Sequence, residues 1–135
     1  MGNNAVPDIA NQEVRSRMSP SAETIFINIM RAWNVGDEDA RRLLGGVSAE
    51  SYEAMKSEES TAALSEGQLM RVSYLVGIYK ALRILLNDEL ATTWMTRPND
   101  NNIFGGMTPL AYCVKEGISG LQMVRKLLDA QCQGK

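Results

Sequence analysis

The chain's apolar positions recur mainly with the period of an α-helix. From Ala22 to Trp33, and again from Leu121 to Leu128, apolar residues follow one another at steps of three or four, which places them on one face of a helix. No segment shows the sustained alternation of apolar and polar residues that is typical of a half-buried strand. The pattern therefore predicts an all-α protein.

Capping signals divide the first half into three helices. Ser19-Pro20 is typical of a helix start with proline at the first helical position, so we expect the first helix from Pro20 to about Asn34. Three acidic residues after Gly36 predict a second helix that ends at Gly45-Gly46. Ser48 then caps a third helix through Met55. Residues 1–18 are polar and are expected to form a flexible leader.

The second half contains four more predicted helices. Ser65 and Gln68 have the spacing of a capping box ahead of a long apolar segment, "LMRVSYLVGIYKALRILL". Asn87 caps "DELATTWMT", Thr108-Pro109 opens the next helix, and Ser119 with Gln122 suggests a capping box for the last one. The final "AQCQGK" lacks helix signals beyond its first two residues. These boundaries predict a leader (1–18), a helix-turn-helix-like portion (19–64) and a second helical domain (65–135).

The segment "RPNDNNIFGGMTPL", residues 97–110, interrupts two of these helices. Pro98 stops one helix, the Asn and Asp side chains bond to nearby backbone, and Gly105-Gly106 permits positive φ before Thr108 caps the next helix. Phe104 has two interpretations: it pins the loop to the core beside Trp94, or it contacts a partner directly. We expect a binding loop here.

Composition argues against catalysis and metal binding. The chain has no His, and Cys113 and Cys132 are too few and too far apart for a zinc site or a disulfide framework. Its carboxylates sit mostly at helix starts, where capping explains them. We therefore expect no enzyme activity, no metal and no cofactor. No apolar run approaches the ~20 residues of a membrane span and no secretion leader opens the chain, so the expected location is the cytoplasm.

The second and third helices have the spacing of a helix-turn-helix, but their charge opposes DNA binding. Residues 1–60 hold six Lys or Arg against ten Asp or Glu, a net charge of −4. Acidic side chains in the recognition position repel phosphates, which supply most non-specific affinity. Residues 61–135 hold eight basic and six acidic residues, a net charge of +2. If DNA is bound, the candidate contacts are Ser48, Ser51, Tyr52 and Lys56.

An ordered set of residues in the second half resembles the toxin-binding domain of the Xre/MbcA/ParS antitoxin family. The set consists of Trp94, Pro98-Asn99, Phe104-Gly105-Gly106, Thr108-Pro109-Leu110, Val124-Arg125 and Leu128-Asp129. The upstream "ARRLLGGVSAESYEAMK" is more loosely similar to the family's Xre-like helix-turn-helix, and its Glu50, Glu53 and Ala54 depart from the usual basic and aromatic residues.

The resemblance implies an antitoxin that covers the active-site entrance of a RES-domain toxin, an enzyme that consumes NAD or transfers ADP-ribose from it. A homodimer is a further expectation. Two alternatives stay open, a DNA-binding autorepressor and a helical adaptor without a toxin. The residues expected to bind the toxin are Trp94, Arg97, Asn99, Asn102, Phe104, Gly105, Gly106, Arg125, Gln131, Gln133 and Lys135.

Overall fold

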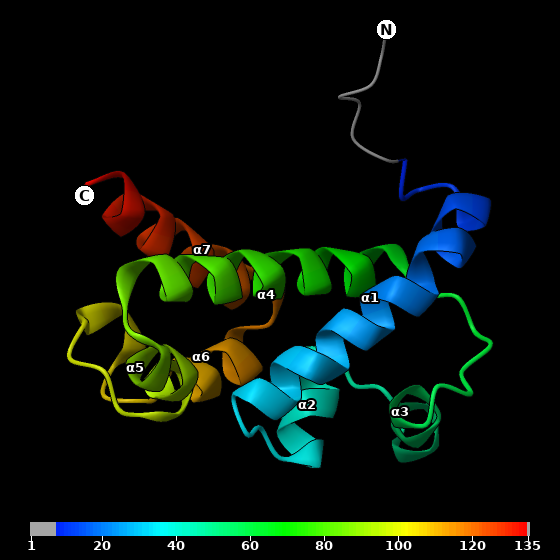
Figure 1. The fold of residues 1–135 in the computed structure, drawn as a ribbon, viewed down its shortest axis with the longest axis horizontal. Helices are drawn as coiled ribbons and strands as arrows, with labels where there is room; N and C mark the ends of the chain where they lie inside the picture. Colours follow the sequence, from blue (N-terminus) through cyan, green and yellow to red (C-terminus); the bar gives the residue numbers. More distant parts are fainter. Residues whose placement is uncertain (1–7, 135) are drawn as a thin grey trace, which may run out of the picture.

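A computed structural model describes residues 8–134 of the chain, and within this range it contains helices and no strand (Figure 1). The all-α prediction is therefore confirmed. The elements are α1 (Gln12–Ala32), α2 (Asp37–Leu43), α3 (Ala49–Lys56), α4 (Glu66–Leu85), α5 (Asp88–Thr93), the 3₁₀ turns η1 (Trp94–Thr96) and η2 (Asn102–Phe104), α6 (Pro109–Glu116) and α7 (Ile118–Gln133).

Helix α4 is the central element, and the other helices pack around it (Figure 1). Helix α1 crosses one side of α4, while α7 lies along the other side and runs in the same direction. This parallel alignment places Arg125 beside Ser73 and Cys132 beside Ala81. The shared core contains the apolar faces of all three helices, including Phe26, Leu75, Ile78, Leu121 and Val124. Helices α2 and α3 lie below α1 in Figure 1, and α5 and α6 lie below the carboxyl end of α4.

Most helix starts are where the capping signals predict them. The Ser65 hydroxyl accepts a hydrogen bond from Gln68 N at 3.1 Å, and the Gln68 side chain accepts one from Ser65 N at 2.8 Å, which completes the capping box. Single caps are made by Ser48, Asn87 and Thr108. These contacts span three residues, so local sequence determines them.

The predicted start of the first helix is wrong. Helix α1 begins at Gln12, two turns earlier, where the Asn11 side chain accepts from Glu13 N at 2.8 Å. Pro20 therefore lies inside the helix. Ser19 is not a cap, because its hydroxyl donates to Arg15 O at 2.6 Å and accepts from Leu64 N at 2.8 Å. Residues 12–18 are thus helical rather than part of a flexible leader.

The predicted limits of the last helix are also wrong at both ends. Helix α7 begins at Ile118, immediately after Gly117 with φ 69°, and the Ser119 hydroxyl donates to Glu116 O at 3.1 Å instead of capping. At the other end the helix continues to Gln133, with Gly134 N bonded to Ala130 O at 3.1 Å. Packing against α4 extends the helix beyond its local signals.

In the part of the chain that the structure describes, every helix is too short or too polar to cross a membrane.

Candidate functional site

An aromatic cluster supports the loop between η1 and α6. The Phe104 ring is 0% exposed and meets the edges of two other rings, with centroid distances of 6.0 Å to Trp94 and 5.3 Å to Tyr112. Perpendicular aromatic pairs at this separation add to the stability gained from burial. Phe104 is therefore a core residue that holds the loop from beneath, and its interpretation as a direct partner contact is wrong.

The loop's own side chains fix its backbone. The Asn99 Oδ1 accepts from Asn101 N at 2.9 Å, and the Asn101 Oδ1 accepts from Ile103 N at 3.0 Å. Gly105 and Gly106 follow with φ of 57° and 87°, in the left-handed region that favours glycine. The positive φ predicted for this pair is confirmed. The loop backbone is thus preformed by its own side chains and by the conformation of its glycines.

A hollow of about 430 Å³ opens beside the loop. Its walls are Trp94, Arg97, Pro98, Asn99 and Asp100. Arg97 is exposed and forms no ion pair with any residue from 8 to 134. The hollow thus combines an aromatic ring, a guanidinium without an ion-pair partner among residues 8–134, an amide and a carboxylate, which suits a polar side chain of another protein.

A second group of expected partner contacts lies on α7. Arg125 Nε is 3.2 Å from Asp129 Oδ2, and Arg125 Nη1 is 3.5 Å from Ser73 O on α4. Gln133 follows Asp129 by one helical turn and continues this polar stripe. Gln131 is only two residues from Gln133, so the two side chains point about 200° apart around the helix.

The expected partner contacts therefore do not form a single patch. The loop residues, including the exposed Asn102, Gly105 and Gly106, make one group, and Arg125 with Gln133 makes another. Gln131 belongs to a different side of α7. Lys135 lies outside the described residues.

The role of Gly77 was not predicted from the sequence. The Arg125 guanidinium lies directly across this glycine, and a Cβ at position 77 would collide with it. A glycine inside a long helix costs about 1 kcal/mol relative to alanine, and such a residue often indicates close packing. That signal was present in "YLVGIYK".

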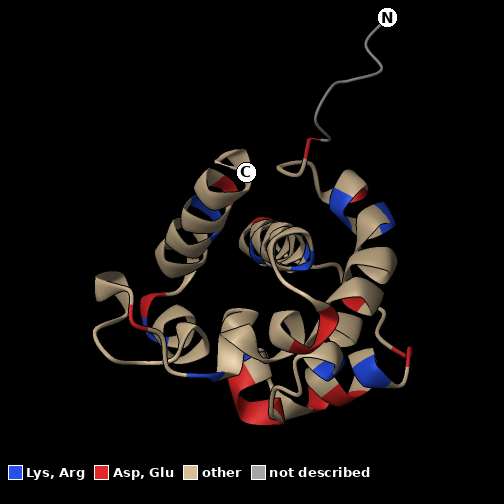
Figure 2. Ribbon diagram, turned by 60° about the vertical axis from the view of Figure 1, so that its left-hand side comes forward, with Lys and Arg blue, Asp and Glu red and all other residues tan. Residues whose placement is uncertain are grey.

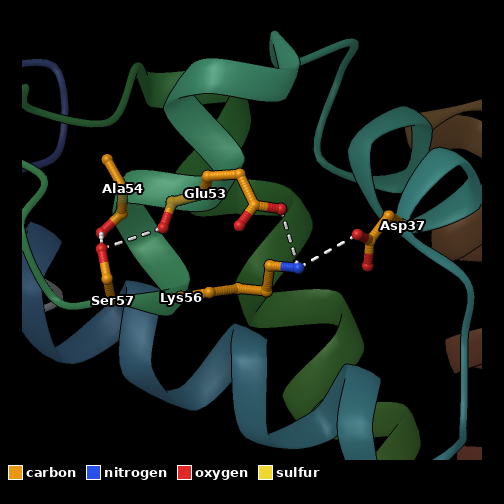
Figure 3. A network of polar contacts seen from close by, with 5 residues as sticks. All are labelled: Asp37, Glu53, Ala54, Lys56 and Ser57. Carbon is orange, nitrogen blue, oxygen red and sulfur yellow. Dashed lines mark hydrogen bonds and ion pairs between the residues drawn. The ribbon is translucent and has the colours of Figure 1, made fainter.

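The expected DNA contacts on α3 are largely occupied by bonds within the protein (Figure 3). Lys56 Nζ is 3.0 Å from Asp37 Oδ2 and 2.9 Å from Glu53 Oε2. Tyr52 is only 3% exposed and packs edge-on against Phe26, so its expected position on a DNA-facing surface is wrong. The part played by Asp37, which ties α2 to α3 through Lys56, was not predicted.

Two further features of α3 reduce its fit to DNA. The Ser48 and Ser51 hydroxyls bond to each other at 3.0 Å. Acidic residues gather along the lower edge of Figure 2, and the first turns of α2 and α3 are acidic. Glu50 and Glu53 also line an open hollow on α3. A phosphate approaching this edge meets carboxylates before it meets Lys56.

Metal-ligating and thiol groups give little sign of a reactive centre within residues 8–134. No three His, Cys, Asp or Glu residues are grouped there so that they could hold a metal ion. Cys113 is buried, and burial raises the pKa of its thiol to about 12, so the reactive thiolate is scarce at neutral pH.

A comparison with known protein families matches the segment that contains the loop and α7. Residues 81–134 match the model of the antitoxin Xre/MbcA/ParS C-terminal toxin-binding domain. The chain is also 31% identical, over 116 residues, to the uncharacterized protein y4oB of Sinorhizobium fredii (strain NBRC 101917 / NGR234), a match that covers 85% of this chain and 87% of that protein. No solved structure matches the chain. Residues 81–134 therefore belong to the family of antitoxin Xre/MbcA/ParS C-terminal toxin-binding domains.

Proposed function

We propose that this antitoxin binds a RES-domain toxin in the cytoplasm and blocks the entrance of its NAD-using active site. The observation that carries the proposal is the match of residues 81–134 to a toxin-binding domain whose loop is held rigid by the buried Phe104. The antitoxin performs no reaction in this scheme. The NAD chemistry belongs entirely to the toxin.

The preformed loop favours tight binding. Because side-chain bonds and positive-φ glycines already fix its backbone, little conformational entropy is lost when the loop meets a partner. The free Arg97 beside Trp94 gives the surface a charged anchor next to an aromatic one. Arginine and tryptophan are the residue types that most often dominate interface energetics.

Blocking an entrance requires contacts on more than one element, and the two groups of candidate residues meet that requirement. The loop extends from the 3₁₀ turns, while Arg125 and Gln133 lie along α7. We propose that the loop docks beside the toxin's entrance and that the end of α7 covers it.

The test measures whether the purified product of the neighbouring gene turns over NAD and whether this chain inhibits that turnover. We expect the wild-type chain to abolish turnover at stoichiometric concentration. Arg97→Glu should weaken inhibition about tenfold or more, because it reverses the charge in the hollow. Lys115→Glu, an identical charge change at an exposed site on α6, is the matched control and should inhibit like the wild type.

Undiminished NAD turnover in the presence of folded wild-type protein would contradict the proposed function. Equal losses of inhibition for Arg97→Glu and Lys115→Glu would show that overall charge, rather than the loop, controls binding.

A further inference from the structure

A second surface, outside the toxin-binding loop, is an apolar groove between α1 and α4. The hollow has a volume of about 650 Å³, and its apolar walls include Ile9, Met18, Ala22, Ile25, Leu69 and Met70. Ile25 leaves 43% of its surface exposed and borders these other apolar side chains, and contiguous apolar patches often indicate interaction sites. We call this feature the α1–α4 groove.

The floor of the groove continues along the outward face of α4. Met70, Ser73, Gly77 and Lys80 follow one another at steps of three or four residues and so lie on one side of the helix. Ser73 is small and exposed, so a partner can approach α4 at this position, whereas Gly77 is already covered by the Arg125 guanidinium. Figure 2 looks nearly along α4 and shows α1 on one side of it and α7 on the other.

The groove is continuous with the α7 contacts of the proposed function. Ser73 lines the groove, and its carbonyl oxygen accepts the hydrogen bond from Arg125 on α7. Ser73 therefore links the two surfaces, because it contacts Arg125 and also lines the apolar groove.

Two positive charges lie at or near the groove, and only Arg17 is among the residues that line it. Arg17 lines the groove on the α1 side, and Lys80 lies two helical turns beyond Ser73. Neither forms an ion pair with another residue in the range 8–134. An occupant with acidic residues beside an apolar stripe would complement both cations.

We propose that the α1–α4 groove receives an amphipathic α-helix of the toxin, with its apolar side chains between α1 and α4 and its acidic flank against Arg17 and Lys80. The groove is lined by residues 17–25 of α1 and 69–74 of α4, so both of its walls are helical, as in helix-in-groove recognition. This inference rests on the proposed function and extends the toxin contact to the first half of the chain.

The test compares two variants of α1 in binding to the purified RES-domain toxin, measured by calorimetry. Ile25→Glu places a carboxylate on the groove wall, whereas Thr24→Glu places the same charge on an exposed neighbouring site that does not line the groove. We expect Ile25→Glu to weaken toxin binding at least about tenfold and Thr24→Glu to leave it within about twofold of the wild type. Helical circular dichroism and thermal melting of each free variant verify that both are folded.

A second pair of variants tests the charge of the occupant. Arg17→Glu and Lys80→Glu should each weaken toxin binding, and the loss should diminish at high salt. Unchanged affinity for both would contradict an acidic flank.

The possible failures are distinguishable. If Arg97→Glu weakens binding and Ile25→Glu does not, the groove proposal is wrong and the proposed function stands. If Ile25→Glu leaves toxin affinity unchanged but disrupts self-association in sedimentation, the groove receives a second copy of this chain, which also overturns the proposal. If the wild type fails to bind the toxin, both proposals are refuted.

Discussion

Arg125 on α7 lies across Gly77 on α4, and its guanidinium occupies the space that a side chain at position 77 would need. The contact continues to Ser73 O on the same helix, at 3.5 Å, and to Asp129 on α7, at 3.2 Å. Because Gly77 has no side chain, the Arg125 guanidinium can lie directly against α4. Two surfaces proposed to bind the toxin meet at this point.

Gly77→Ala should displace Arg125 without unfolding the protein. Alanine improves helix propensity by about 1 kcal/mol, which offsets the loss of a partly exposed ion pair worth about 0–1 kcal/mol. We expect the free energy of unfolding to change by less than about 1 kcal/mol, while toxin affinity falls. A double-mutant cycle with Arg125→Ala should give a coupling energy of at least about 0.5 kcal/mol in binding, and strict additivity would contradict the link.

Phe104→Ala should strongly destabilise the protein. The ring is fully buried between Trp94 and Tyr112, and truncation of a buried phenylalanine costs about 3–5 kcal/mol. Urea unfolding followed by circular dichroism measures the loss. Ile103→Ala is the matched control, since its side chain is partly exposed in the same 3₁₀ turn, and it should cost clearly less. An equal cost for both would show that Phe104 is not the anchor of the loop.

Gly105→Val should cost about 1–3 kcal/mol through backbone strain alone. Gly105 has φ 57°, and a Cβ at this site would meet nothing within 4 Å, so steric crowding adds no penalty. Gly105→Asn is the control, because asparagine tolerates this conformation, as Asn34 does in this chain with φ 57°. Equal melting temperatures for the valine and asparagine variants would contradict the role of positive φ.

Glu23 should make stability fall as pH rises above about 4.5. The residue is 7% exposed, and burial raises the pKa of its carboxyl above the ordinary value of 4.5, with Ser60 as hydrogen-bond donor at 3.1 Å. A carboxyl with a higher pKa in the folded state binds its proton more tightly there. Its contribution to the free energy of unfolding therefore decreases between the unfolded and the folded pKa.

Glu23→Gln removes this proton linkage and keeps an acceptor for Ser60. The variant should gain stability relative to the wild type as pH rises from 4 to 7, measured as the difference in urea midpoint. A difference that stays constant across this range would show that the carboxyl has the same pKa in both states.

Operator binding should be weak at physiological salt. The exposed face of α3 presents Glu50 and Glu53, and Lys56 is already paired with Asp37. Gel shifts on the protein's own promoter should show only micromolar or weaker, strongly salt-sensitive binding. A nanomolar specific complex would overturn this expectation.

The sequence predicted those features that short-range chemistry controls. Helix starts at Ser48, Ser65, Asn87 and Thr108 depend on bonds across three residues, and Gly105 depends on its own φ. Features that depend on distant segments were not predictable in the same way. Ser19 has the sequence of a helix cap because Pro20 follows it. Its actual partner, Leu64 N, is 45 residues away, and no local pattern indicates that bond.

In the candidate site, too, local features were predicted from the sequence and features that depend on distant segments were not. The motif from Trp94 to Asp129 located the loop and α7, but composition could not decide whether Phe104 or Tyr52 faced outward. Both are buried because α1, α6 and η1 pack against them. The α1–α4 groove also depends on how two helices meet, and no local pattern marks it.

Helix α4 has a practical consequence for anyone who expresses the toxin-binding domain alone. The segment that defines the family begins at Ala81, inside this helix, and so omits Ser73 and Gly77, on which Arg125 rests, and the buried Leu75 and Ile78. A fragment cut at that boundary would leave the inner surface of α7 facing water. We therefore expect a fragment that begins at Ser65 and keeps all of α4 to be more stable than one that begins at Ala81.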